Sequence, residues 1–249
     1  MAGEVISLAA HPKALDRLFS GEPARTVLDF ALRELAPGRI AVVSSFGADS
    51  AVLLHLVASV DPATPVIFLD TGKHFPETLA HRDRLVARLG LRDVRSVGPD
   101  PDAVRAIDPD GGLHARTPDA CCALRKSEPL EHALDGFDVW ITGRKRYQAA
   151  SRHGLPLFEA DGARIKVNPL AAWEADDLAD HMAIHQLPAH SLVARGYPSI
   201  GCAPCTSAVH TGEELRAGRW RGTGKTECGI HLSHNGRFLR TLTQAAAGQ

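Results

Sequence analysis

Short apolar runs rich in β-branched residues alternate with helical segments over the first part of the chain, and this alternation limits the possible folds most. Residues 39–46 are predicted to be a buried strand, and residues 65–70, 91–97 and 137–143 are predicted to be the next three strands. Two segments between them, ADSAVLLHLVASV and PETLAHRDRLVARLG, have helical patterns, the second with proline near its start and glycine at its end. The alternation predicts an α/β fold, an open parallel sheet with helices on both faces.

The pattern changes after Gly143. GRKRYQAASRHG reads as a polar, basic loop, LPLFEADGARIKVNPL predicts a hairpin turning at Asp161–Gly162, and EADDLADHMAIHQ predicts a helix. From Arg195 onward glycine, proline, arginine and threonine dominate, and periodicity fades. This last part is expected to be an extended segment that wraps around the fold or moves, not a second core.

Composition excludes several classes of function. The 249 residues are 44% hydrophobic and 23% charged, as is ordinary for a soluble globular protein. A net charge of −1 gives no reason to expect nucleic acid or a membrane as a partner. The N-terminal stretch lacks the basic region of a secretory signal, and the longest apolar run, residues 51–60, is too short to span a bilayer. A cytoplasmic location is therefore expected.

Five cysteines are divided into two pairs and one separate residue. Cys121 and Cys122 are adjacent, and Cys202 and Cys205 form a C-x-x-C motif. An odd count in a reducing compartment argues against a disulfide framework, and adjacent cysteines fit disulfide geometry poorly. Four thiolates suit a zinc ion or an iron–sulfur cluster, and adjacent thiolates reach the separate iron corners of a cubane more easily. The pattern favours iron–sulfur and leaves zinc, or simple burial of either pair, as alternatives.

The fifth cysteine, Cys228, stands apart in GTGKTECGIHL. The glycines before it suggest a mobile arm, and Lys225 and His231 are close enough in sequence to lower its pKa. A thiolate on such an arm is a candidate nucleophile, while a free cysteine without a role is the alternative. Lys126 lies four residues after Cys122, on the same helical face, and is a candidate cation between metal site and substrate.

The loop SSFGADS, residues 44–50, joins the first predicted strand to its helix. Ligands of open parallel sheets lie beyond such strand ends, and helix-start N–H groups favour an anion. Gly47 allows close approach of the backbone, and hydroxyls come from Ser44, Ser45 and Ser50. An ordinary turn capped by Asp49 or Ser50 is the alternative.

This loop is not a P-loop, but it is similar to the S-G-G-x-D-S loop of the ATP-pyrophosphatase superfamily. Ser45-Phe46-Gly47 replaces the segment with paired glycines, and Asp49-Ser50 is retained. The departure argues against cleavage of ATP to pyrophosphate and favours a relative that binds a shorter adenosine anhydride.

Basic residues gather in two further stretches. GRKRYQAASR follows a predicted strand end, and RAGRW comes later; together they supply Arg144, Lys145, Arg146, Arg152, Arg216 and Arg219. Guanidinium groups bind sulfate and phosphate oxygens in bidentate fashion, and Gln148 and Ser151 add uncharged donors. The two stretches favour an anionic-substrate site over a solvated basic surface.

Taken together, these motifs resemble the adenylyl-sulfate and phosphoadenylyl-sulfate reductase family, and within it the assimilatory, thioredoxin-dependent adenylyl-sulfate reductases. The resemblance covers residues 44–231 through SSFGADSAVLLHLV, FLDTGKHFPETL, CCALRKSEPL, ITGRKRYQAASR, VNPLAAW, GYPSIGCAPCT and ECGIH. The combination of C-C, C-x-x-C and E-C-G-x-H is highly specific. It implies the adenine nucleotide alpha hydrolase-like version of the α/β fold.

The resemblance also implies chemistry. Cys121, Cys122, Cys202 and Cys205 would hold one 4Fe–4S cluster per subunit. Cys228 would attack the sulfur of adenosine 5′-phosphosulfate, expelling AMP and leaving an S-sulfocysteine from which thioredoxin or glutaredoxin releases sulfite. Lys126 and His231 would assist catalysis. The expected substrate contacts are Ser44, Ser45, Phe46, Gly47, Ser50, Arg144, Arg146, Arg152, Arg216 and Arg219.

The predicted organisation is an N-terminal helical segment (1–36), a nucleotide-binding α/β domain with the cluster (37–210) and a mobile C-terminal catalytic tail (211–249). Whether the chain forms a homo-oligomer is left open. The nearest alternative is reduction of phosphoadenylyl sulfate, alone or in addition. An ATP-dependent adenylating or tRNA-thiolating enzyme and a non-enzymatic iron–sulfur or zinc regulator are more distant ones, because neither uses both the arginine loop and Cys228.

Overall fold

The computed structural model describes residues 11–231, and within them the chain forms a six-stranded sheet with the order β3-β2-β1-β4-β6-β5. Every neighbouring pair is parallel except β5 with β6. The α/β prediction is therefore confirmed, with one antiparallel edge strand. The strands are β1 (Ile40–Val43), β2 (Val66–Leu69), β3 (Val94–Val97), β4 (Val139–Ile141), β5 (Phe158–Asp161) and β6 (Arg164–Val167).

The strands are shorter than the apolar runs that predicted them. β1 ends at Val43, because the chain leaves the sheet at Ser44 to begin the loop before the next helix. The hairpin turns at Asp161–Gly162 as predicted, with Gly162 in the left-handed region at φ 63°. The pattern did not predict that β6 would join the main sheet beside β4, because strand pairing depends on tertiary contacts.

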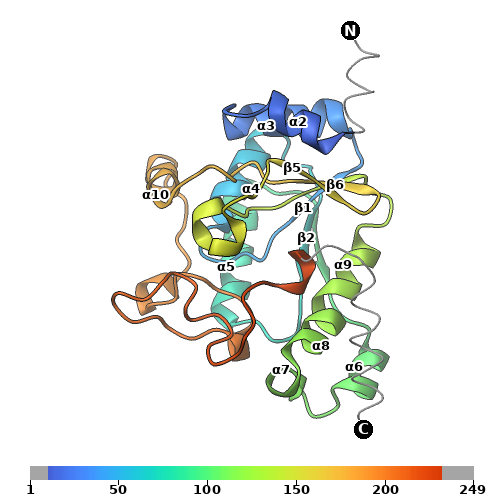
Figure 1. Cartoon of the computed structure of the whole chain (residues 1–249), viewed down its shortest axis with the longest axis vertical. Coiled ribbons are helices and arrows are strands. Elements are labelled where there is room, and N and C mark those ends of the chain that lie inside the picture. Colours follow the sequence, from blue (N-terminus) through green and yellow to red (C-terminus); the bar gives the residue numbers. More distant parts are fainter. Residues whose placement is uncertain (1–10, 232–249) are drawn as a thin grey trace.

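Helices cover both faces of the sheet (Figure 1). Those predicted from the sequence are α4 (Ser50–Val60), α5 (Pro76–Leu89) and α10 (Ala175–Ile184). Two helices, α2 (Pro12–Leu18) and α3 (Ala24–Phe30), precede the sheet, and α3 continues into η1 (Ala31–Leu35). The segment from β3 to β4 contains α6 (Pro101–Ile107), α7 (Leu113–Arg116), α8 (Pro118–Cys122), η2 (Ala123–Ser127) and α9 (Glu128–Ala133). Short 3₁₀ turns are η3 (Arg146–Gln148), η4 (Ala150–Arg152), η5 (Val193–Arg195), η6 (Ala203–Cys205) and η7 (Gly229–His231).

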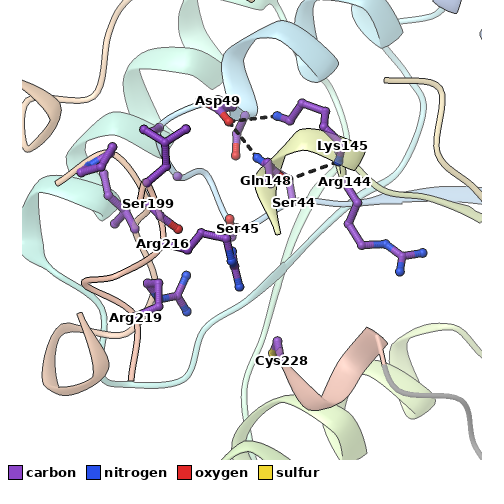
Figure 2. Close-up of a pocket in the computed structure, with 18 of the residues that line it drawn as sticks. Ser44, Ser45, Asp49, Arg144, Lys145, Gln148, Ser199, Arg216, Arg219 and Cys228 are labelled. Atoms are coloured by element: carbon purple, nitrogen blue, oxygen red, sulfur yellow. Dashed lines mark hydrogen bonds and ion pairs between the residues drawn. The ribbon is translucent and has the colours of Figure 1, made fainter. Parts of the chain in front are cut away.

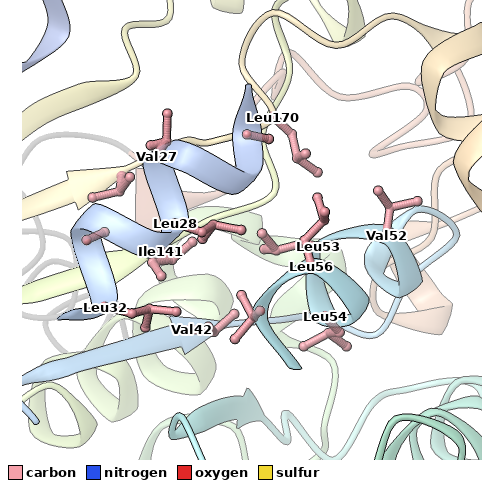
Figure 3. Packing of buried hydrophobic residues seen from close by; sticks show 14 of the residues in the cluster. Val27, Leu28, Leu32, Val42, Val52, Leu53, Leu54, Leu56, Ile141 and Leu170 are labelled. Atoms are coloured by element: carbon pink, nitrogen blue, oxygen red, sulfur yellow. The ribbon is translucent and has the colours of Figure 1, made fainter. Parts of the chain in front are cut away.

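Successive residues of β1 face opposite layers of the core, as the strand period requires. Val42 packs with Leu28 of α3 and Leu53 of α4 in the larger cluster (Figure 3), whereas Ala41 packs with Trp140 of β4 on the other face. Because apolar residues cover both faces of the central strands, these strands are near-continuously hydrophobic. No helix among residues 11–231 is long and apolar enough to cross a membrane.

The strand order positions the functional site. β1 lies between β2 and β4. From β1 the chain runs outward to β2 and β3 on one side, and it then crosses back to form β4 on the other side of β1. Such a switch point opens a crevice beyond the carboxyl ends of the strands. The loops that follow β1 and β4, residues 44–50 and 142–152, meet there. The last described segment returns to the same region, where η7 packs on η2. The three-part division stays a prediction, and residues 1–10 and 232–249 lie outside the described part.

Candidate active site

A cavity of about 520 Å³ opens beyond the carboxyl ends of β1 and β4. Its wall comes from the loops after these strands, from α10, from residues 198–201 and from the tail, residues 215–231. Figure 2 shows Cys228 on the tail side of this cavity, with Asp49 and Lys145 on the far side. The volume is typical of a site that encloses a small ligand.

The loop after β1 contains a residue other than glycine with a positive φ. Phe46 has a φ of 48°, in the left-handed region where glycine is preferred. Its ring is fully buried and packs edge-on against Phe68 at 5.6 Å between centroids. Burial of the ring offsets a backbone cost of about 1–3 kcal/mol. The S-G-G-x-D-S loop that this stretch resembles has paired glycines, which adopt a positive φ without this cost.

The start of α4 is not capped by a side chain. Asp49 precedes the helix, yet its carboxylate makes no cap hydrogen bond. The carboxylate instead accepts hydrogen bonds from Lys145 Nζ at 2.9 Å and Gln148 Nε2 at 3.0 Å. These contacts tie the first loop to the basic loop, and they hold the start of the 11-residue helix at the wall of the cavity, where the helix dipole favours an anion.

Two cavity arginines are paired with one carboxylate from the tail. Arg152 donates two hydrogen bonds to Glu227, at 2.7 and 2.8 Å. Arg216 lies 3.6 Å from the same carboxylate. Burial alone would raise the pKa of Glu227, but the hydrogen bonds and charge of Arg152 hold it below its usual value. In this arrangement the carboxylate of Glu227 takes the place that an anionic ligand would occupy.

Arg219 differs from these two. Within residues 11–231 its guanidinium makes no ion pair, and its buried Nε has no hydrogen-bond partner. The group stacks on Trp220 at 4.4 Å from the ring centroid and lies against Gly201, where a Cβ would overlap it. A buried cation is costly, and within the described residues this one is balanced by cysteine sulfurs, Cys228 above all, and by no carboxylate, so it stays available to an anion in the cavity.

Cys228 faces the cavity from the start of η7 and is 9% exposed. Lys126 Nζ lies 4.0 Å from its sulfur. A hydrogen bond with Cys122 and the positive charges of Lys126 and Arg219 lower the pKa of Cys228 well below its usual value, although burial opposes them. The contact therefore favours the thiolate, which is the nucleophilic form.

The other four cysteines gather beside this site. Cys121, Cys122, Cys202 and Cys205 line one small cavity together with Lys126. None of the four is in a disulfide, and burial raises the pKa of Cys121 to about 11. Of the adjacent basic pair, Arg125 is structural: it bonds Asp108 at 2.7 Å and the Thr71 carbonyl at 2.9 Å.

Comparison with known proteins gives the family. Residues 39–208 match the phosphoadenosine phosphosulfate reductase domain. The chain belongs to the adenylyl-sulfate and phosphoadenylyl-sulfate reductase family. A family member from Mesorhizobium japonicum named adenosine 5′-phosphosulfate reductase is 54% identical over 91% of this chain and 89% of its own length. Another of that name from Chelativorans sp. is 48% identical over 96% of this chain and 100% of its own.

Solved structures agree with the family and the fold. A phosphoadenylyl-sulfate reductase from Candida auris, in complex with phosphate, superimposes with a TM-score of 0.68 at 25% identity, covering 80% of this chain and 96% of that one. The FMN adenylyltransferase of Candida glabrata has a TM-score of 0.52 at 15% identity, covering 88% and 81%, and shares the fold alone. The predicted resemblance and the adenine nucleotide alpha hydrolase-like fold are both confirmed.

The cavity of this reductase-family member brings together most of the predicted substrate contacts. Ser44, Ser45, Gly47, Ser50, Arg144, Arg152, Arg216 and Arg219 line it, as do Lys126, His231 and Cys228. Phe46 and Arg146 do not: Phe46 is in the core, and Arg146 donates to the Leu155 carbonyl at 2.8 Å. Arg144 reaches the cavity wall, but its guanidinium pairs with Glu159 of β5.

His231 also differs from its predicted setting. Its ring stacks on Trp140 with an interplanar angle of 6°. Burial, together with the charges of Arg144 and Arg152, lowers its pKa well below the usual value. His231 is thus a neutral imidazole at neutral pH and does not supply the positive charge that was expected to act on Cys228; Lys126 and Arg219 do.

Glu227 is the cavity residue that sequence reasoning missed. It belongs to the E-C-G-x-H motif, immediately before the predicted nucleophile, so a signal was present. Its role was not apparent because its partner Arg152 is 75 positions away in the sequence.

The tail of this chain crosses the C-x-x-C segment at a glycine, Gly218. A Cβ on Gly218 would overlap the Ser207 carbonyl, a backbone atom, whereas one on Gly224 meets nothing within 4 Å. Gly218→Ala is therefore expected to displace the segment that carries Arg219, at a cost of about 1–3 kcal/mol, and to lower kcat/KM roughly tenfold or more. Gly224→Ala is the matched control, and steady-state kinetics of both variants checks this; equal rates for the two would contradict it.

Proposed function

We propose that this protein reduces adenosine 5′-phosphosulfate to sulfite and AMP in assimilatory sulfate reduction, acting in the cytoplasm as an oxidoreductase on a sulfur group. Membership of the family supports the class of reaction, and the name shared by its relatives at 54% and 48% identity supports the substrate. The observation that carries the proposal is the thiol of Cys228, 4.0 Å from Lys126, facing a cavity lined by arginines.

In the first step, the Cys228 thiolate attacks the sulfur of the sulfate group. A sulfur–sulfur bond forms as the bond between that sulfur and the bridging phosphate oxygen breaks. AMP leaves with the electron pair, and the enzyme carries Cys228 as an S-sulfocysteine. AMP is a good leaving group, so the protein's task is to align and neutralise a crowded anionic centre.

In the second step, one thiolate of a dithiol protein, thioredoxin or glutaredoxin, attacks the Cys228 sulfur. Sulfite departs with the electron pair of the sulfur–sulfur bond and a mixed disulfide remains. The second thiol resolves it, restoring the Cys228 thiolate and oxidising the dithiol. Two electrons come from the dithiol, and substrate sulfur passes from oxidation state VI to IV.

The residues on the cavity wall divide this work. The loop 44–50 and the start of α4 would bind the nucleotide phosphate, because the serines of this loop line the cavity and the helix dipole favours an anion there. Arg219 and Lys126 would neutralise sulfate oxygens beside Cys228. Lys126 is well suited, because burial lowers its pKa but the charge of Cys228 and the neighbouring Cys202 and Cys122 raise it overall, so it stays charged.

Substrate binding in this arrangement requires the tail to move. Arg152 and Arg216 are paired with the carboxylate of Glu227, next to the nucleophile. We infer that the incoming anion replaces Glu227 at these arginines, because both carry the same charge to the same donors. The exchange would release the tail for the second step, in which a protein dithiol has to reach a sulfur that is 9% exposed.

The donor set suits the iron–sulfur cluster predicted from the sequence. Four thiols line one cavity. Among residues 11–231, three ligand atoms lie within 4.8 Å of one another only in a histidine group, and the cysteine sulfurs form no such group. Thiolates on a single zinc ion would be about 3.8 Å apart, a spacing that no three of these sulfurs share in the described part of the chain, whereas a four-iron cluster would take each thiolate at a separate corner. Bound there, a 4Fe–4S cluster would supply fixed charge beside Lys126 and join α8 to the C-x-x-C segment.

The decisive test is the mass of the protein after incubation with adenosine 5′-phosphosulfate and no reductant. The peptide holding Cys228 is expected to gain about 80 Da, the mass of one SO₃ group, and one equivalent of AMP should be released. Adding reduced thioredoxin should remove the adduct and release sulfite. Adduct formation with phosphoadenylyl sulfate alone would overturn the choice of substrate, and AMP release without an adduct would overturn the intermediate.

A further inference from the structure

We propose that His55, His181 and His185 form a binding site for a zinc ion, separate from the cysteine cavity and from Cys228. The three histidines are brought together by two helices, and no step of the proposed reduction uses them. Neutral imidazole nitrogen is a preferred zinc ligand, and three histidines with a water molecule complete a tetrahedral site.

The geometry needs only small adjustments to hold an ion. His55 Nδ1 lies 3.0 Å from His181 Nε2, and one ligand atom from each of the three rings lies within 4.8 Å of the others. Nitrogens bound at about 2.1 Å in a tetrahedron are roughly 3.4 Å apart. The observed 3.0 Å is slightly shorter than this value, and the upper limit of 4.8 Å for the other separations leaves shifts of about an ångström to bring all three nitrogens to one ion.

The backbone holds the ligands in place. His181 and His185 are four residues apart at the end of α10, on one face of that helix, and the third ligand comes from the middle of α4. The rings already lie against one another in tilted pairs, with His55–His185 and His181–His185 centroids 4.3 and 4.4 Å apart. A hydrogen bond explains one contact, between His55 and His181, but it does not explain why the third ring lies against both.

The surroundings allow a metal to enter and leave. His185 is exposed, while the other two rings are half-buried, so the ion can reach the site from solvent and keep a water ligand. Trp173 packs edge-on against His181 and shields one side. Arg88 is the nearest cation, with its Nη2 3.5 Å from the His185 carbonyl; its exposed charge is screened by solvent.

A metal here would stabilise one wall of the active-site cavity. In α10 only Leu178 is fully buried, and Ile184 is 73% exposed. Figure 1 shows this helix at the outer edge of the molecule. Yet Leu178, Ala179 and Met182 line the cavity. An ion joining the end of α10 to α4 would hold these side chains in position without touching substrate.

The experiment is a zinc titration of tag-free Cys228→Ser protein that keeps its native metal content, followed by dialysis and zinc K-edge X-ray absorption. The Cys228→Ser background removes the one cysteine outside the predicted cluster set. One equivalent of zinc is expected, with nitrogen and oxygen scatterers at about 2.0–2.1 Å and no sulfur at about 2.3 Å. Hydrogen exchange in α10 should slow when zinc is added.

Adding His181→Gln or His185→Gln to this background is expected to weaken zinc binding at least about tenfold and remove its effect on α10 exchange. His132→Gln, an exposed histidine on α9, is the matched control and should change neither. Both test residues lie near the surface of a peripheral helix, and far-ultraviolet circular dichroism will show that the variants fold. Sulfur ligation, or equal zinc binding by the His181→Gln and His132→Gln proteins, would overturn the proposal.

Discussion

Replacing Cys228 with serine is expected to abolish sulfite release, with a fall in kcat of about 10⁴-fold or more, the scale for losing an essential nucleophile. Serine occupies nearly the same volume, but its hydroxyl stays protonated where Lys126 and Arg219 hold the pKa of the thiol far below its usual value. The sulfonate adduct should vanish as well. The measurement is sulfite formation in the presence of excess dithiol protein.

Two controls separate this effect from damage to the fold. AMP affinity should stay within about a factor of two, since the loop 44–50 and the start of α4 do not touch the substituted atom. The visible absorbance of the metal centre should persist, since Cys228 is not one of the four cysteines that share the neighbouring cavity. Turnover retained by the variant would refute the role of Cys228.

The Cys202→Ser substitution should have the opposite signature. The iron content, the brown colour and the activity are expected to fall together, with activity lower by more than about 100-fold, because the substitution removes one of the four proposed cluster ligands. Cys202 lies within 3.3 Å of the Thr71 hydroxyl, at the edge of the loop after β2, so losing the centre would also loosen this loop beside Lys126.

The Cys228→Ser protein is the matched comparison, because each variant replaces one cysteine by serine: Cys228 lines the larger cavity, and Cys202 lines the small cavity beside it. Iron and sulfide analysis, visible absorbance and sulfite formation should be measured on both proteins side by side. An active, colourless Cys202→Ser protein would defeat the assignment of the four cysteines to a metal centre. Loss of iron from both variants would place Cys228 among the ligands and reverse the proposed division of the five cysteines.

Local patterns predicted much of the fold correctly. Runs of six to eight residues marked the strands β1 to β4, and Gly90 ended α5 in the left-handed conformation, with φ 63°. Their limits were less accurate: the run at 39–46 contains only four strand residues. Periodicity measures how apolar a segment is, whereas a strand ends where its hydrogen-bonded neighbour ends.

The site was predicted less completely than the fold. Charge clusters identified the right loops, but they did not distinguish Arg219, which pairs with no carboxylate among residues 11–231, from Arg144 and Arg146, which are held by partners elsewhere. Nor did they indicate that Phe46 would turn into the core. The position and partners of each of these side chains depend on which groups the fold places opposite it. The neighbouring residues in the sequence do not indicate those groups.

The sequence by itself determined the alternation of strands and helices, the division of the cysteines into four and one, and the family. These follow from local chemistry: side-chain shape, spacing and the kinds of donor in short motifs. Only the tertiary structure decided that Glu227 pairs with Arg152, that Lys126 faces the Cys228 sulfur, and that three histidines meet between α4 and α10. Those contacts join residues far apart in the chain, and packing of the whole domain sets their distances.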